Sequence, residues 1–422
     1  MNYGPPRGMR DFYPEDMRKR NRLFDCWRSA ALKHGFEEYD APVVETEELL
    51  TRKSGEEIVH QIYNFQDKSG RALALRPEMT PSLARMVIAR QSSLSFPLKW
   101  FSVPQCFRYE RMTRGRKREH FQWNLDIIGE EGAIAEAEVL STALTALIST
   151  GLTADDFKVR VGDRRLLEAL FNSTGIPTNQ FQAVCLALDK RGKISDEAMA
   201  ELLKDHGLSP ESIDKAFKLV AIESMDEAEH LLKDPTPLDN LRTVFALMGN
   251  YGLAEFLVFD LSIIRGLDYY TGTVFEAFDT QRKFRAIFGG GRYDNLLSSL
   301  GGQTVPCVGL GFGDVVVWEL LEDLGLGNVD QSSCNVFIGY MSEEEQNLAM
   351  KAAGALRKAG RSVMLALKPQ KPKKLFASAS KAGAGFAMFI GPSEREQNSL
   401  VVKNLIEGTQ ETVPLDQLAE KI

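Results

Sequence analysis

Cysteine and histidine are both scarce in this chain, and neither is arranged for metal binding or for nucleophilic catalysis. The 422 residues include five cysteines, none in a CxxC pair: Cys26, Cys106, Cys185, Cys307 and Cys334. This scattered, odd set fits reduced thiols in the cytoplasm and contains no pair that suggests zinc. The five histidines have neither metal-ligand nor Ser-His-Asp spacing, so we expect no protein-bound metal and no serine hydrolase.

Long apolar runs are also missing. No stretch approaches the roughly 20 apolar residues that span a membrane, and Met1–Arg7 lacks the apolar core of a secretory signal. We therefore expect a cytoplasmic protein without a membrane segment. The net charge of -7 at pH 7 argues against indiscriminate binding to nucleic acid, although it leaves room for a local basic surface.

The chain has an ordinary globular composition, with 44% hydrophobic and 26% charged residues. Its length is sufficient for two or three domains. Strands and helices without regular alternation predict an α+β domain at 1–325, with an antiparallel sheet and a helical insertion at about 162–250. A linker at 326–333 precedes a second domain, 334–422, in which strands alternate with helices. That alternation predicts a small α/β fold with a mostly parallel sheet.

Periodicity and turn residues locate the individual elements. We expect strands at Tyr63–Phe65, Leu73–Leu75, Trp100–Val103, Phe121–Ile128, Phe256–Ile264, Thr273–Phe278, Arg285–Phe288 and Val305–Gly311. Long apolar-periodic helices are expected at about 134–147 and 314–324. The glycine-rich segment Gly289–Asp294 is expected to form a tight turn into a helix.

The densest positive charge lies in the segment Phe107–Gln122. Six basic residues fall between Arg108 and Arg118, around Gly115, and strand-like sequence lies on either side. Guanidinium groups bind phosphates through paired hydrogen bonds, so such a hairpin can hold phosphates. The alternative is a solvated turn, but Arg108 lies at a strand position, where an arginine that only aids solubility has little reason to be.

Two other segments carry polar groups that are costly to bury without a ligand. Arg265–Glu276 places an arginine and paired tyrosines directly before an alternating strand-like run, and a buried arginine favours an anionic partner. Upstream, Glu78 and Thr80 are two residues apart, so on a strand they would share a face and could both contact an ammonium group. The alternative is a structural ion pair between Arg76 and Glu78.

These segments, in this order, resemble the histidyl-tRNA synthetases, a family of class II aminoacyl-tRNA synthetases. The resemblance runs from about Gly8 to Gln410 and includes Ala187–Lys190 in the insertion. It implies a homodimeric histidine–tRNA ligase, which forms histidyl-adenylate from histidine and ATP and then esterifies the 3′ end of tRNA(His). Mg²⁺ would shield the triphosphate. The alternative is a catalytically silent paralogue, such as the histidine-binding regulatory subunit of ATP phosphoribosyltransferase.

The resemblance also implies a role for each matching residue. Arg108, Glu110 and Arg116 match positions that contact ATP, and Arg108 and Arg265 match the catalytic arginines on opposite sides of the reacting phosphate. The positions that match histidine-binding residues are Glu78, Thr80, Gln122, Asp126, Arg265, Tyr269, Tyr270 and Tyr293. Asp126 replaces a glutamate of many members, which retracts the carboxylate by about 1.5 Å. His120 is expected near the substrate.

The third family motif departs from the pattern at Val316. The segment Pro306–Val316 has this valine where members commonly have an arginine that stacks on adenine near the γ-phosphate, and Asp314 adds an acidic residue nearby. The loop residues Arg116 and Arg118 are the candidates to replace the missing cation. The departure favours the silent paralogue, whereas the arginines at 108, 116 and 265 favour the enzyme.

The second domain has an uneven charge distribution. Between Glu345 and Glu394 there is no acidic residue but there are nine basic ones. A solvated helix face would normally mix both signs, so this distribution predicts a surface for a polyanion. The resemblance implies that the domain binds the anticodon of the tRNA.

Overall fold

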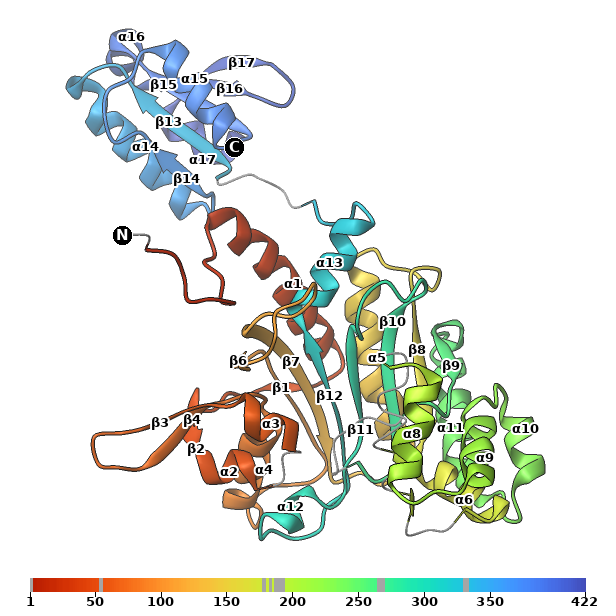
Figure 1. The fold of residues 1–422 in the computed structure, drawn as a ribbon. Helices are drawn as coiled ribbons and strands as arrows, with labels where there is room; N and C mark the ends of the chain where they lie inside the picture. The colour runs from red at the N-terminus through yellow and green to blue at the C-terminus, as the bar shows by residue number, and fades with distance from the viewer. Residues whose placement is uncertain are drawn as a thin grey trace. The chain divides into compact units, whose positions relative to one another are not determined.

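The computed structural model describes residues 3–52, 56–176, 180–181, 184–185, 194–263, 270–328 and 334–422. They belong to two compact units, Met1–Asn328 and Val329–Ile422, whose elements are labelled in Figure 1. The predicted fold class is confirmed, since a large, mainly antiparallel sheet with helices is followed by a smaller α/β unit with its own sheet. Within the described residues, no helix is both long enough and apolar enough to cross a membrane.

A nine-stranded sheet forms the centre of the larger unit. Its strands lie in the order β1-β5-β7-β12-β11-β10-β8-β9, and β6 pairs with the beginning of β7. The outermost pairs, β1–β5 and β8–β9, are parallel, and the pairs between them are antiparallel. The bounds are β1 Glu37–Glu38, β5 Leu98–Ser102, β6 Gln105–Phe107, β7 Glu119–Ile128, β8 Phe157–Asp163, β9 Leu257–Phe259, β10 Thr273–Asp279, β11 Phe288–Arg292 and β12 Cys307–Gly313.

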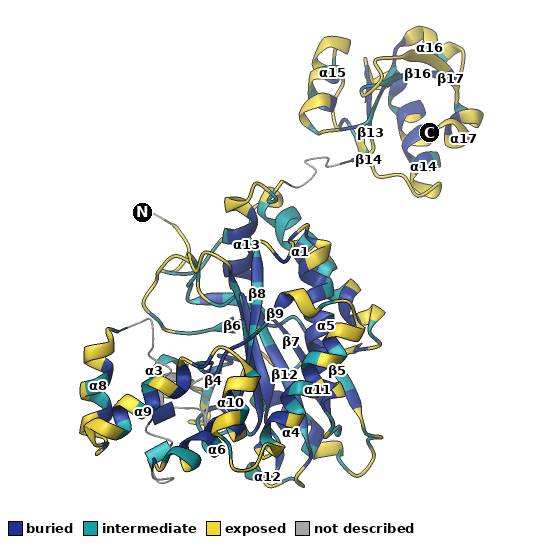
Figure 2. Ribbon diagram, turned by 90° about the vertical axis from the view of Figure 1, so that its right-hand side faces the viewer, coloured by how far each residue is buried: buried dark blue, intermediate teal, exposed yellow. Residues whose placement is uncertain are grey.

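Two long helices, α1 (Pro14–Lys33) and α5 (Ile134–Ser149), pack on one face of this sheet. Trp27 of α1 lies 6.0 Å from the ring of Trp123 on β7 and 5.1 Å from the ring of Phe312 on β12. This contact buries large apolar area and fixes the helix on the sheet. The strands beneath are buried (Figure 2).

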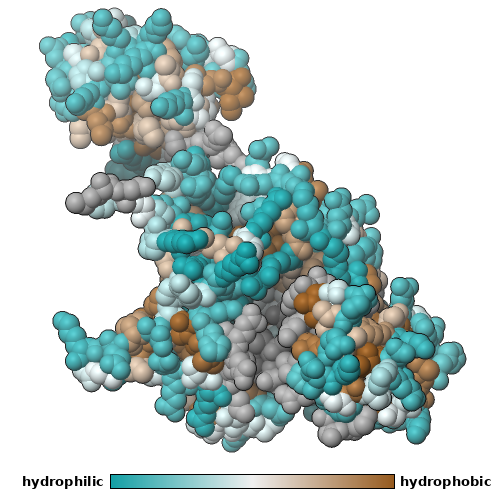
Figure 3. All heavy atoms as spheres, viewed as in Figure 1, coloured by the Kyte–Doolittle hydropathy of each residue, from teal (hydrophilic) through white to brown (hydrophobic). Residues whose placement is uncertain are grey.

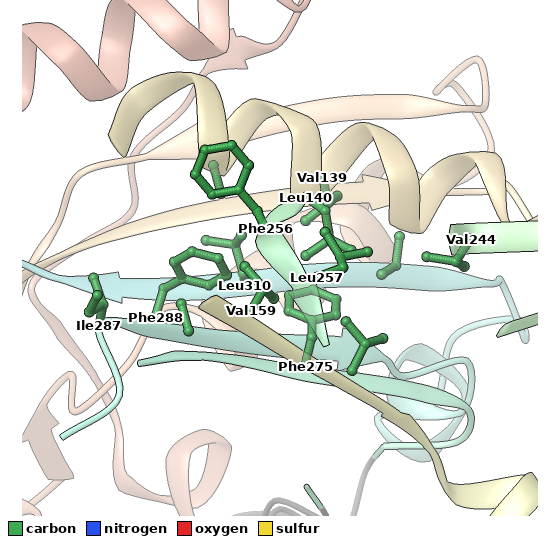
Figure 4. Packing of buried hydrophobic residues seen from close by; sticks show 14 of the residues in the cluster. Val139, Leu140, Val159, Val244, Phe256, Leu257, Phe275, Ile287, Phe288 and Leu310 are labelled. Carbon is green, nitrogen blue, oxygen red and sulfur yellow. The ribbon is translucent and has the colours of Figure 1, made fainter. Parts of the chain in front are cut away.

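The packing of α5 leaves the other face of the sheet for polar residues. Figure 4 shows Val139 and Leu140 of α5 against apolar side chains of the sheet, including Val159 and Leu310. Since side chains alternate along a strand, the residues next to Leu310 face the opposite side. Two further helices of the unit are α12 (Leu296–Ser299) and α13 (Asp314–Asp323).

A small sheet and the insertion complete the larger unit. The small sheet has the order β2-β4-β3, with helices beside it, and its bounds are β2 Val44–Thr46, β3 Tyr63–Gln66, β4 Ala72–Leu75, α2 Glu47–Thr51, α3 Glu56–Gln61 and α4 Thr80–Arg90. The described helices of the insertion are α6 Arg164–Thr174, α8 Asp196–Asp205, α9 Pro210–Val220, α10 Met225–Leu231 and α11 Thr236–Asn250. Ser195, Ser209 and Ser224 cap α8, α9 and α10 with their side chains. Since β8 continues to Asp163, the helices begin at Arg164.

The second unit has a five-stranded sheet of order β14-β13-β15-β16-β17. Its bounds are β13 Val336–Tyr340, α14 Gln346–Lys358, β14 Val363–Leu365, α15 Pro372–Lys381, β15 Phe386–Ile390, α16 Pro392–Glu396, β16 Ser399–Asn404, β17 Gln410–Pro414 and α17 Leu418–Lys421. The pairs β13–β14 and β13–β15 are parallel, whereas β15–β16 and β16–β17 are antiparallel. The expectation of a mostly parallel sheet was therefore wrong, because β16 and β17 form a terminal antiparallel hairpin.

Two local expectations in the larger unit were also wrong. The segment Gly289–Asp294 does not form a tight turn into a helix, because Gly289–Arg292 belong to β11 in the middle of the sheet. Glu78 and Thr80 do not lie on a strand, since β4 ends at Leu75 and α4 begins at Thr80. Pro77 ends the strand ladder, and Pro81 suits the first turn of a helix.

Candidate active site

A strip of the central sheet carries no side chains on the face opposite α1 and α5. Gly289 of β11 pairs with Gly311 of β12, and Gly291 pairs with Gly309. We call these four residues the glycine strip. Glycine weakens a strand interior, so four of them on one face indicate that other groups need the space. The floor of this site is therefore backbone.

Side chains of β7 extend over the glycine strip. A Cβ at Gly309 would lie 2.0 Å from Asp126 Oδ1, and one at Gly311 would lie 2.6 Å from Gln122 Nε2. Both side chains occupy space that ordinary strand residues would fill. The glycines thus explain how an acidic and an amide group can lie flat across the neighbouring strand.

Asp126 is the buried acidic residue of this face. Its Oδ1 accepts a 2.5 Å hydrogen bond from the hydroxyl of Tyr293, and only 5% of the residue is exposed. Burial raises the pKa of Asp126 to about 7, and the Tyr293 hydrogen bond opposes that rise. The carboxylate therefore changes charge near neutral pH and suits recognition of a polar ring N–H.

Tyr270 contributes the other side of the strip. It lies three residues before the start of β10 and is buried in one apolar cluster with Tyr293. A Cβ at Gly291 would lie 3.0 Å from Tyr270 Cδ1, so the ring lies against the strip. The structure therefore brings together four of the predicted histidine-binding residues: Gln122, Asp126, Tyr270 and Tyr293.

The basic hairpin joins this site to the segment that carries Glu78 and Thr80. Arg108 follows β6, and its Nε donates a 3.0 Å hydrogen bond to the Pro77 carbonyl oxygen. Glu78, the next residue, is 6% exposed. Arg76, which the alternative interpretation paired with Glu78, forms an ion pair with Asp40, at 3.0 Å from Nη1 to Oδ1.

Within the hairpin, Arg116 forms an ion pair with Glu110. Arg118 stacks on Tyr109, with 3.9 Å between the guanidinium carbon and the ring centre. His120 lies on the stem, where burial and the charges of Arg108, Arg10 and Arg116 lower its pKa to about 3. The imidazole of this residue is thus neutral beside a concentration of positive charge.

Val316, which replaces the arginine expected from the family resemblance, packs beneath the loop of the basic hairpin. Val316 is 8% exposed, in the core, and a Cβ at Gly115 of the hairpin loop would lie 3.3 Å from its Cγ2. The valine supports the loop rather than facing solvent. Asp314 is also accounted for, since it is 1% exposed and pairs with Arg10 Nη2 at 3.0 Å. Burial raises the pKa of Asp314 to about 6.

Some predicted residues lie outside the described residues. These are Arg265, Tyr269 and the insertion landmark Ala187–Lys190. The described chain resumes at Tyr270 on the glycine strip.

Two features of the site escaped the sequence analysis. Tyr39 and Ser102 approach Asp126 from the β1–β5 side of the sheet. Arg10 holds both Asp314 and Glu119 in an ion-pair cluster, with 2.6 Å from its Nε to Glu119 Oε1. A two-residue parallel strand such as β1 gives no periodic signal, and the partners of Arg10 are more than 100 positions away.

Comparison with known proteins identifies the family of this chain. A family model described as histidyl-tRNA synthetase matches residues 8–313, and one described as an anticodon binding domain matches residues 335–422. The chloroplastic/mitochondrial histidine–tRNA ligase of Arabidopsis thaliana is 43% identical over 420 residues, which cover 99% of this chain and 86% of that protein. The histidine–tRNA ligase of Opitutus terrae is 38% identical over 418 residues, which cover 97% and 96%.

The similarity extends to a solved structure. The histidyl-tRNA synthetase from Nostoc sp. PCC 7120 is 26% identical, with a TM-score of 0.85, and the match covers 100% of this chain and 99% of that one. The glycine strip, its acidic and phenolic side chains and the basic hairpin thus occur in a chain that matches both family models and full-length relatives. This chain belongs to the histidyl-tRNA synthetase family.

Proposed function

We propose that this protein is a histidine–tRNA ligase, which forms histidyl-adenylate from histidine and ATP and transfers the histidyl group to the 3′ end of tRNA(His). The observation that carries the proposal is the buried Asp126, hydrogen-bonded to Tyr293 over the glycine strip, on the same sheet as an arginine-rich hairpin. Asp126, Gln122, Tyr270 and Tyr293 would surround the histidine side chain, together with Tyr269. Glu78 and Thr80 would bind its ammonium group.

The hairpin would hold ATP. In this proposal Arg108 contacts the α-phosphate, Glu110 lies near the adenine and Arg116 lies toward the γ-phosphate. Arg265 would contact the carboxylate and the α-phosphate from the other side, so that two guanidinium groups stabilise the charge that grows on phosphorus. The Glu110–Arg116 ion pair supports this arrangement because it fixes both side chains before ATP binds.

Magnesium would come to the site with ATP. The described residues include no group of three or more His, Cys, Asp or Glu side chains arranged to hold a metal ion. Mg²⁺ usually binds through substrate phosphates, water and one or two carboxylates, so a protein cage is not required. The ion would shield the triphosphate charge while the arginines orient it.

The second unit would bind the anticodon arm. All nine basic residues between Glu345 and Glu394 are exposed in the structure. Clustered cations that are free to meet solvent support phosphate contacts, which give affinity without sequence information. A cytoplasmic location agrees with this role and stays a prediction.

A homodimer is supported by an apolar face of the small sheet. The paired residues Val44, Leu75 and Tyr63 share one side of that sheet with Phe65, and Val44 and Phe65 are 37% and 45% exposed. Hydrophobic residues gather in this part of the surface in Figure 3. We propose that a second copy covers this face. Phe65→Glu should convert the protein to monomers in light scattering, whereas Gln66→Glu, at an exposed position of the same strand on the opposite face, should not.

The deciding experiment is histidine-dependent exchange of pyrophosphate into ATP, followed by transfer to tRNA. Exchange is expected in the native protein. Arg108→Ala and Arg265→Ala should abolish most of it, and Arg71→Ala, which removes an exposed ion pair with Asp67 in a distant turn, should not. Histidine binding without exchange, at saturating ATP and Mg²⁺, would overturn the ligase and favour the silent paralogue.

A further inference from the structure

Tyr39 shares a face of the central sheet with the acidic residue of the site, Asp126, and is influenced by its charge, although the two are distant in sequence. It follows β1, and its N–H donates a 2.9 Å hydrogen bond to the carbonyl of Phe101 on β5. Its ring centre is 5.7 Å from that of Trp100, and Trp100 pairs in register with Asp126 of β7. Tyr39 therefore approaches Asp126 from the β5 side, while Tyr293 approaches from the β12 side.

The hydroxyl of Tyr39 is buried and lacks a hydrogen bond of normal geometry. Tyr39 Oη and the neighbouring Ser102 Oγ form none in the part of the chain that the structure describes, although Ser102 is near enough to oppose the rise in the pKa of Tyr39. Burial and the charge of Asp126 raise the pKa of Tyr39 well above its usual value, so the hydroxyl remains a proton donor. An unpaired buried hydroxyl is unfavourable, which suggests that it acquires a partner when the site is filled.

Within the described part of the chain, the carboxylate of Asp126 has a hydrogen bond to only one of its two oxygens. Tyr293 donates to Oδ1, but no hydrogen bond reaches Oδ2 from the described residues. The side chain is also one methylene shorter than the glutamate that the family resemblance implies at this position. A carboxylate that is short and held on one side only needs a second contact to keep a fixed direction.

We propose, building on the proposed function, that Tyr39 is a positioning residue of the histidine site, whose hydroxyl donates to Asp126 Oδ2 when histidine binds. The carboxylate is then held by two phenols, one from each side, and presents its remaining lone pairs to an imidazole N–H. The arrangement compensates for the short side chain at position 126. It also favours the ionised form of Asp126, because hydrogen bonds to a carboxylate stabilise its charge.

The proposal predicts opposite effects of Tyr39→Phe on stability and on histidine binding. The free protein loses an unpaired hydroxyl, so its melting temperature stays the same or rises. The histidine KM in exchange rises about tenfold, as expected for one hydrogen bond to a charged group, with little change in kcat. The control Tyr251→Phe, which removes a hydroxyl bound to Glu138 outside the site, leaves the KM unchanged.

A pH profile and a rescue separate positioning from packing. The acid limb of histidine binding should move to higher pH in Tyr39→Phe. The groups that face Asp126 from the packed elements are Tyr39, Tyr293 and Cys307, and burial raises the pKa of each, so none of them titrates near neutral pH. Asp126→Glu in the Tyr39→Phe background should recover most of the affinity, since a longer side chain reaches the ring without the second phenol.

Calorimetric titration of histidine into the protein, without ATP, separates the test of Tyr39 from the test of the proposed ligase function. Equal affinities of the native protein and Tyr39→Phe, with normal exchange, would overturn the role of Tyr39 and leave the ligase intact. Weaker binding in Tyr39→Phe without exchange in either protein would support Tyr39 and overturn the ligase. A native protein that binds no histidine would overturn both.

Discussion

Replacing Gly309 with alanine tests whether the glycine strip exists to accommodate Asp126. The new Cβ would lie 2.0 Å from Asp126 Oδ1 and 2.9 Å from the Leu125 carbonyl oxygen. Ordinary contacts of a Cβ begin at 3.4 Å, so the carboxylate has to retreat by about 1.4 Å. Its hydrogen bond from Tyr293, now 2.5 Å, would then exceed the normal range.

The size of the effect follows from that hydrogen bond. A bond to a charged group contributes about 1.5–3 kcal/mol, which corresponds to a roughly 10- to 100-fold rise in histidine KM at a tenfold change per 1.4 kcal/mol. The ATP KM should change little, because the hairpin lies at the other end of β7. Initial rates of pyrophosphate exchange, measured against each substrate, give both constants.

Gly313→Ala is the matched control. It lies on the same strand, and a Cβ there would meet nothing within 4 Å, so the histidine KM should remain native. Circular dichroism of both variants checks that the sheet is retained. A Gly309→Ala protein that is folded and has a native histidine KM would refute the assignment of the strip to the substrate site.

Three further predictions concern the framework of the site. Glu136→Ala should destabilise the larger unit by about 3–5 kcal/mol, because it removes the partner of Arg292 in a buried ion pair with two contacts, of 2.7 and 2.6 Å. Urea denaturation measures this loss. An equal loss in the double variant Arg292→Met/Glu136→Met would contradict the ion-pair explanation. Val316→Arg should raise the ATP KM without changing the histidine KM, since it forces a charge beneath Gly115. A lower ATP KM would show instead that arginine at this position restores a contact with ATP. Asp126→Asn should become more stable relative to the native protein as pH rises from about 4 to about 7. The native carboxyl has a folded pKa of about 7, so it destabilises the native fold over the pH range in which it ionises only in the unfolded state. A difference in unfolding free energy between the two proteins that does not change with pH would rule this out.

Sequence reasoning identified the local elements better than the surfaces they form. The basic hairpin and the strand that carries Gln122 and Asp126 were predicted because charge and alternation are visible within one segment. The run Gly289–Gly291 was predicted as a turn, since glycine is typical of turns, and its place in β11 depends on partners in β12 and β10. The contacts of Tyr39 depend on a strand of two residues, which carries no periodic signal.

The second unit shows the same limit. Its parallel strands were recognised because helices separate them, whereas β16 and β17 were not, although Val401 and Val402 are good strand formers. The assignments of Arg265 and Tyr269 rest on the family resemblance, because these positions lie outside the described residues. The roles of all the site residues stay predictions until the kinetic experiments are done.

The glycine strip has a consequence for how this site can change during evolution. The specificity of a pocket usually changes through shorter or longer side chains in its lining, but a floor made of backbone has no side chain to shorten. A side chain added at Gly309 or Gly311 would meet Asp126 or Gln122, and one added at Gly291 would meet Tyr270. We therefore expect substitutions to be tolerated mainly among the side chains around the floor, at positions such as Tyr39, Asp126 and Tyr293. The floor keeps the shape of the site constant, while around it a shorter side chain at one position can be compensated by a longer one at a neighbouring position.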